Sequence, residues 1–98
     1  MEIPSVADRL SVAASLLDAV AADLGHVSAE VAVECLFAVE QLEMSGAHSV
    51  SVDLFDDDPR SRLRLAMAEL AALDDDALSR PPVLAAARAT RHAYRGLD

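Results

Sequence analysis

Two runs of three aspartates are the most conspicuous chemical feature of this sequence. Asp56 to Asp58 stand directly before Pro59, and a second run covers residues 74–76. Calcium-binding loops need oxygen ligands at alternating positions, a central glycine and a distal glutamate, and neither run has that pattern. Aspartate is a preferred N-cap, and proline suits the first position of a helix. The sequence therefore predicts that Asp58 caps a helix beginning at Pro59 and that the second run ends this helix.

A second group with chemical potential is His26, Glu30 and Glu34, which are spaced at intervals of four. If a helix begins early enough to include all three, they share one face and offer nitrogen and oxygen ligands to a metal ion. They support one alternative function, a small metal- or ligand-binding protein or an enzyme. Cys35 lies in an apolar run, which predicts a buried thiol and not a nucleophile. Beyond that alternative, the sequence assigns no catalytic residue, no metal site and no cofactor.

The composition predicts a single folded domain over residues 1–98. The chain has 98 residues, a formal net charge of −9, 53% hydrophobic residues and only 3% aromatic residues. Its length allows one modest core, and its apolar content is too high for a disordered chain. The core must consist mainly of leucine, valine and alanine. The sequence shows no secretory signal and no apolar run of about 20 residues, so we expect a cytoplasmic protein without membrane contact.

Four segments have apolar residues that recur every three or four positions, which is typical of helices packed on a core. We predict helices over about residues 5–24, 29–45, 59–73 and 81–95. They should form a mainly α, compact, four-helix bundle-like domain. The first helix should bury Val6, Leu10, Ala13, Leu17, Val20 and Leu24.

Polar residues and glycines mark the helix ends. Ser5 with Asp8, and also Ser28, fit N-caps, because their side-chain oxygens can accept backbone N–H groups of the first turn. Gly25 and Gly46 fit the ends of the first two helices. Before the two prolines at 81 and 82, Ser79 is the predicted start of the last helix.

The helix predicted over residues 29–45 is apolar on most sides. One stripe consists of Val31, Cys35, Ala38 and Leu42, and much of the remaining surface is covered by Val33, Leu36, Phe37 and Val39. A helix of this kind is usually surrounded by other helices. We therefore expect it at the centre of the bundle, with Leu36 buried.

Residues 50–54 alternate between apolar and polar types. Val50, Val52 and Leu54 are separated by single polar residues, which predicts one short strand or extended segment. A lone strand cannot form a sheet, so a true strand would need a copy from a second subunit or from a partner. The segment therefore favours association.

The charges separate along the chain. Between Leu10 and Pro59 there are ten acidic residues and no arginine or lysine, whereas residues 60–98 contain seven arginines and five acidic residues. Arg88, Arg91 and Arg95 are three and four positions apart, so they share one helix face. Two interpretations stay open for this stripe. It is either a solvated face or a face paired with Glu30 and Glu34, or else it is a contact surface for an acidic partner or for phosphates.

The segment "VAADLGHVSAEVAVECL" resembles a helix-turn-helix over about twenty residues, with Gly25 at the turn. The helix that would read DNA carries four glutamates, Glu30, Glu34, Glu40 and Glu43, and no cation. These charges would repel the phosphate backbone. We therefore expect no direct DNA binding.

The sequence favours a small, acidic, non-enzymatic protein–protein interaction module. It should form a homodimer or a complex with a larger protein and should not bind a membrane. The residues predicted to contact the partner are Phe37, Val50, Val52, Leu54, Arg88, Arg91 and Arg95. A further alternative is an acidic mimic of nucleic acid, which would bind a DNA-handling protein in a salt-sensitive manner.

Overall fold

The computed structural model describes residues 5–48 and 58–97, and in these ranges the chain forms five helices and no strand. The helices are α1 (Val6–Ala22), α2 (Ala29–Met44), α3 (Pro59–Ala71), α4 (Asp75–Leu78) and α5 (Pro81–Arg95). The predicted mainly α, bundle-like fold is confirmed. The segment 50–54 lies outside the described residues, so the strand expected there stays a prediction.

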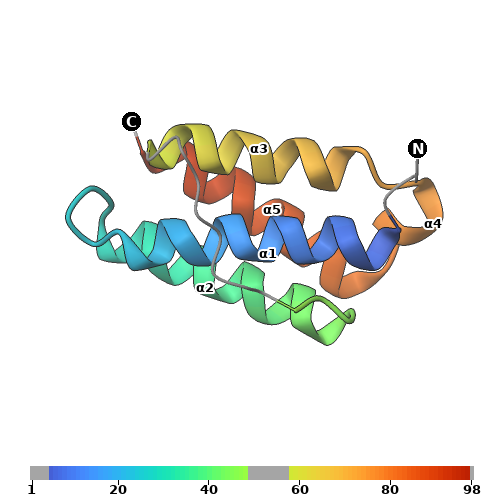
Figure 1. Cartoon of the computed structure of the whole chain (residues 1–98). Helices are drawn as coiled ribbons and strands as arrows, with labels where there is room; N and C mark the ends of the chain where they lie inside the picture. Colours follow the sequence, from blue (N-terminus) through green and yellow to red (C-terminus); the bar gives the residue numbers. More distant parts are fainter. Residues whose placement is uncertain (1–4, 49–57, 98) are drawn as a thin grey trace.

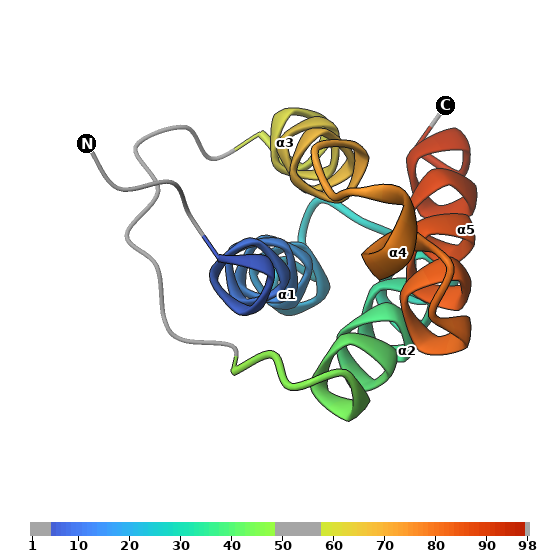
Figure 2. The same cartoon turned by 90° about the vertical axis from the view of Figure 1, so that its right-hand side faces the viewer.

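The four long helices form a ring (Figure 2). α1 packs against α2 and α3, and α5 packs against the same two helices from the other side. The single turn of α4 connects α3 to α5 at one end of the bundle (Figure 1). No long helix is surrounded by the others, so the expectation that α2 lies at the centre is wrong. Each helix of the ring keeps one face toward solvent.

The core inside this ring is made of small side chains. A single cluster contains 24 buried apolar residues, of which eleven are alanine, and none of these described residues is aromatic. Short side chains at a helix contact allow the two helix axes to approach closely. The predicted stripes are confirmed at Leu10, Ala13, Leu17 and Val20 of α1 and at Val31, Cys35, Ala38 and Leu42 of α2. α3 buries Leu63 and Leu70. Leu24 was also expected in the core, but it lies past the end of α1 and is exposed.

Three predicted N-caps are present. Ser5 and Asp8 form a reciprocal capping box at the start of α1. The Ser28 hydroxyl accepts the N–H of Val31 at the start of α2, and the Asp58 carboxylate accepts the N–H of Arg60 at the start of α3. Each cap satisfies a backbone donor that has no partner within its helix.

The second aspartate run has a different role from the one predicted. Asp74 accepts the N–H of Ala77 at 2.8 Å and thereby begins α4, a helical turn that the sequence analysis missed. Ser79 does not cap α5, because its hydroxyl donates backward to the carbonyl of Asp76. The N-cap of α5 is Arg80, which makes no side-chain capping bond. Prolines fill the first two positions of α5 and leave fewer N–H groups that need a cap.

Gly46 ends α2 in a backbone conformation that favours glycine. Its φ is +99°, its N–H donates to the carbonyl of Glu43, and the next N–H, from Ala47, donates to Leu42. This pair of bonds is the Schellman motif, in which a glycine at the left-handed position closes the helix. Ala47 and Leu42 are both buried, which supplies the apolar contact that accompanies the motif.

We expect Gly46→Ala to lower the free energy of unfolding by about 1–2 kcal/mol, because a Cβ atom is strained at positive φ. The measurement is urea unfolding followed by circular dichroism. Gly25→Ala is the matched control, since Gly25 does not have positive φ and an added Cβ would meet no atom within 4 Å. Equal losses in the two variants would contradict the explanation from backbone strain.

Asp58→Ala should lower the free energy of unfolding by about 1 kcal/mol through the loss of the α3 cap. Asp58→Asn keeps an acceptor oxygen at the same position, so it should recover most of that loss in the same urea titration. If asparagine proves as destabilising as alanine, charge and not capping is what Asp58 contributes.

Candidate functional site

The outer face of α2 carries an exposed apolar patch. Val33, Phe37 and Met44 point away from the core on the solvent side of the helix, and Leu36 lies beside them toward α1. Their exposed fractions are 64% for Val33, 51% for Leu36, 44% for Phe37 and 68% for Met44. We call these four residues the α2 patch. Leu36 was expected to be buried; it is exposed because the ring covers only one of the two apolar faces of α2.

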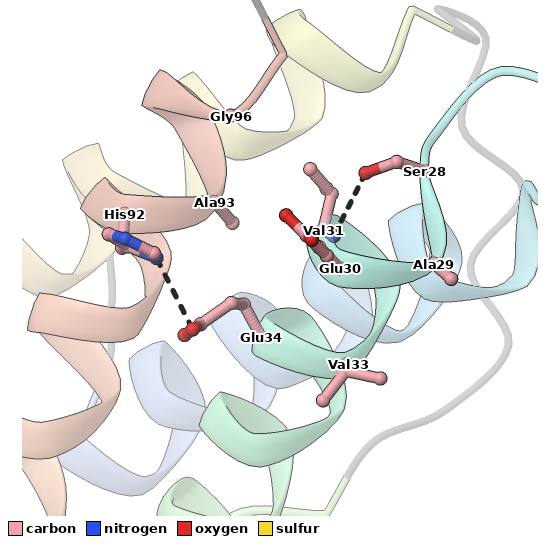
Figure 3. A pocket seen from close by; sticks show the side chains of 9 residues that line it. All are labelled: Ser28, Ala29, Glu30, Val31, Val33, Glu34, His92, Ala93 and Gly96. Atoms are coloured by element: carbon pink, nitrogen blue, oxygen red, sulfur yellow. Dashed lines mark hydrogen bonds and ion pairs between the residues drawn. The ribbon is translucent and has the colours of Figure 1, made fainter.

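A groove between α2 and α5 continues from this patch. Its first hollow, of about 490 Å³, is lined from α2 by Val31, Val33 and Glu34 and from α5 by His92 and Ala93, with Gly96 at the end (Figure 3). A Cβ atom at Gly96 would lie 3.1 Å from Val31 Cγ2. The glycine therefore permits the close approach of the end of α5 to α2.

Glu34 and His92 face each other across the groove (Figure 3). Glu34 Oε1 lies 3.2 Å from His92 Nδ1. A second hollow, of about 440 Å³, begins at the same two residues and is bounded further along by Phe37 and Arg88. Because the two hollows share Glu34 and His92, they form one groove, and Phe37 belongs both to this groove and to the α2 patch.

The predicted arginine stripe lies on the solvent side of α5. Arg88, Arg91 and Arg95 are all exposed, and within residues 5–48 and 58–97 none of them forms an ion pair. The sequence suggested that these arginines pair with glutamates of α2, but His92 and not an arginine bonds Glu34. The structure thus brings Phe37 and Arg88 together at one groove and leaves the stripe accessible. Val50, Val52 and Leu54 lie outside the described residues.

The proposed metal ligands are not brought together. α2 begins at Ala29, so His26 lies in the preceding turn and does not share a helix face with Glu30 and Glu34. The His26 ring bonds Asp23, with 2.8 Å between Nδ1 and the carboxylate. Among the residues that the structure describes, no three His, Cys, Asp or Glu side chains are placed to hold a metal ion. The N-cap at Ser28 is the local reason, because the helix that it starts begins three residues after His26.

Two other side chains with reactive groups, those of Cys35 and Tyr94, are held by the fold of the bundle. Cys35 is fully buried in the core, and burial raises the pKa of its thiol to about 12, so the thiol is protonated at neutral pH. Tyr94 joins α5 to α3: Arg64 donates to its hydroxyl at 3.4 Å, and the Arg60 guanidinium lies 5.4 Å from its ring centre. Two hydrogen bonds to the hydroxyl lower the pKa of Tyr94. The bond from Arg64 has the larger effect, and the bond from Arg60 has the next largest.

The Asp23 carboxylate, by accepting a hydrogen bond from the ring and by its charge, raises the pKa of His26 above 6.5. Protonation is therefore favoured in the folded state. The stabilisation is complete below the pKa of the unfolded chain and is lost as pH rises through the higher folded pKa. We expect NMR titration to show a lower His26 pKa in Asp23→Asn than in the parent protein.

Asp76→Asn is the control for this titration, because it removes one exposed carboxylate at the opposite end of the bundle (Figure 1). It should leave the His26 pKa unchanged. An equal decrease in both variants would show that overall negative charge, and not the bond to Asp23, raises the pKa.

Comparisons with protein-family models, with curated proteins and with solved structures find no match to this chain. In the described parts of the chain, no helix has both the length and the apolar character needed to cross a membrane. The α2 patch, the groove and the arginine stripe are the features from which a function can be inferred.

Proposed function

We propose that this chain is a non-enzymatic protein–protein interaction module that binds through the outer faces of α2 and α5. The observation that carries the proposal is the α2 patch, in which four large apolar side chains are held in water on one side of one helix. Exposing neighbouring apolar groups to water is unfavourable, and covering them with a partner recovers that free energy. The buried half of α2 already stabilises the bundle, so the patch is not needed to complete the core.

The surroundings of the patch have the composition of an interface. Phenylalanine, methionine and arginine are enriched in protein interfaces, and a polar rim usually surrounds an apolar centre. Here Phe37 and Met44 belong to the apolar patch, and Arg88 lies at the edge of the adjoining groove. Glutamates flank the patch, because Glu30, Glu40 and Glu43 are exposed on α2.

The chemistry of the described side chains supports binding in preference to catalysis. The Cys35 thiol is buried and protonated at neutral pH, which disfavours its use as a nucleophile. His26 and His92 each bond a carboxylate, and among the described residues neither ring forms a hydrogen bond with a hydroxyl or thiol that it could activate.

A photo-cross-linking amino acid in place of Phe37 tests this function in an extract of the cells from which the gene comes. We expect a cross-linked protein adduct, which Leu36→Asp should abolish by placing a charge in the patch. The fold should survive, because Leu36 is 51% exposed. Circular dichroism and thermal unfolding check that it does.

Leu65→Asp is the matched control, since Leu65 is also 51% exposed but lies on α3, which is diagonal to α2 in the ring. It should leave the adduct from position 37 unchanged. The proposal is wrong if position 37 gives no protein adduct, or if the two aspartate variants reduce the adduct equally.

A further inference from the structure

The surface formed by α2 and α5 carries two adjacent strips of opposite charge. The acidic strip consists of the exposed Glu30 and Glu40 on α2, a helix that contains no arginine or lysine. The basic strip consists of the exposed Arg88 and Arg95 on α5, a helix that contains no aspartate or glutamate. Arg91 of the same helix lines a hollow against α3 and is not part of this strip. The α2 patch lies along the acidic strip.

These strips run side by side because α2 and α5 are antiparallel neighbours. Val31 lies against Gly96, Glu34 pairs with His92, and Phe37 shares a hollow with Arg88. As residue numbers rise along α2, they fall along the facing part of α5, and Figure 1 shows the two helices running in opposite directions. Glu30 therefore lies near the same level of the groove as Arg95.

We propose, on the basis of the function proposed above, that the partner is a second copy of this chain. The two copies are related by a two-fold axis that runs along the groove between α2 and α5. Rotation about this axis places α2 of each copy against α5 of the other. The acidic strip then meets the basic strip twice in one interface, and the α2 patch of each copy packs on the second copy's α5.

The charge pattern selects this arrangement. A symmetric dimer uses the same patch on both subunits, so the patch must complement itself. A surface with both charge signs complements itself when the acidic half of one copy faces the basic half of the other. The axis along the groove produces this arrangement. An axis across the groove would instead place α2 on α2, with glutamates against glutamates, which is unfavourable.

The net charge of −9 opposes the approach of two copies at long range. At physiological salt, however, charges further apart than about 8 Å are largely screened. Neighbouring groups at the contact then decide the interaction, and these are of opposite sign. Glu30 of one copy faces Arg95 of the other, while the apolar contribution of the α2 patch is not weakened by the screening of charges.

Light scattering coupled to size-exclusion chromatography, over a series of protein concentrations, tests the arrangement. We expect the purified protein to be a dimer. The basic-strip variant, Arg88→Glu with Arg95→Glu, should raise the dissociation constant at least about tenfold, because acidic groups then face acidic groups. The acidic-strip variant, Glu30→Arg with Glu40→Arg, should do the same with basic groups.

An equimolar mixture of the two variants should recover the dimer. Each α2 then faces an α5 of opposite charge again, so the mixed dimer has both of its contacts restored. Leu65→Asp, on α3, is the control and should dimerise like the parent protein. If a strip variant is not folded by circular dichroism, Arg88→Gln with Arg95→Gln replaces it, and we expect a smaller rise in the dissociation constant.

A purified protein that stays monomeric at all concentrations would overturn the second-copy proposal. The interaction function would stand in that case if position 37 still cross-links to a different protein. A basic-strip variant that dimerises as well as the parent would also overturn it, because α2 would then not face α5. If position 37 gives no adduct of any mass, both proposals fail.

Discussion

Close contact between alanine-lined helix faces is the constraint on which the rest of this structure depends. Without large aromatic residues in the described core, the helices fill their common interior by lying near one another. Four helices of this kind are held as a ring, because each can present one narrow buried stripe to two neighbours. Every helix then has a face that the bundle does not cover. The side chains on these uncovered faces decide which molecules can contact the bundle.

For three of the four ring helices, the uncovered face carries mostly small or polar side chains with single apolar exceptions, such as Val12 on α1, Leu65 on α3 and Leu84 on α5. α2 differs because four of its large apolar residues are exposed together. Isolated exposed apolar residues are normal in folded proteins, whereas a cluster calls for an explanation. This cluster and the exposed arginines on neighbouring α5 are the observations from which we propose binding to a partner.

Charged and polar side chains also hold the bundle together, mostly at its ends. The aspartates at 58 and 74 begin α3 and α4, and Arg9 joins α1 to α3 by an ion pair with Glu69 at 3.2 Å. Buried Thr90 and Ser15 donate back to carbonyls of their own helices, so their hydroxyls are satisfied inside the core. The described aspartates of the two runs therefore belong to helix starts and to the surface.

The sequence by itself determined the features that depend on neighbours along the chain. Apolar spacing located the long helices and most buried residues, and the side chains of Ser5, Ser28 and Asp58 located three helix starts, because capping joins residues two or three positions apart. α4 was missed, since a single turn is too short to show a period of its own.

Only the tertiary structure decided which apolar face of α2 is buried, because both faces have helical spacing and the choice depends on where α1 and α5 pack. The tertiary structure also decided that Glu34 pairs with His92, because these two residues are 58 positions apart in the sequence. This pairing leaves the arginine stripe exposed.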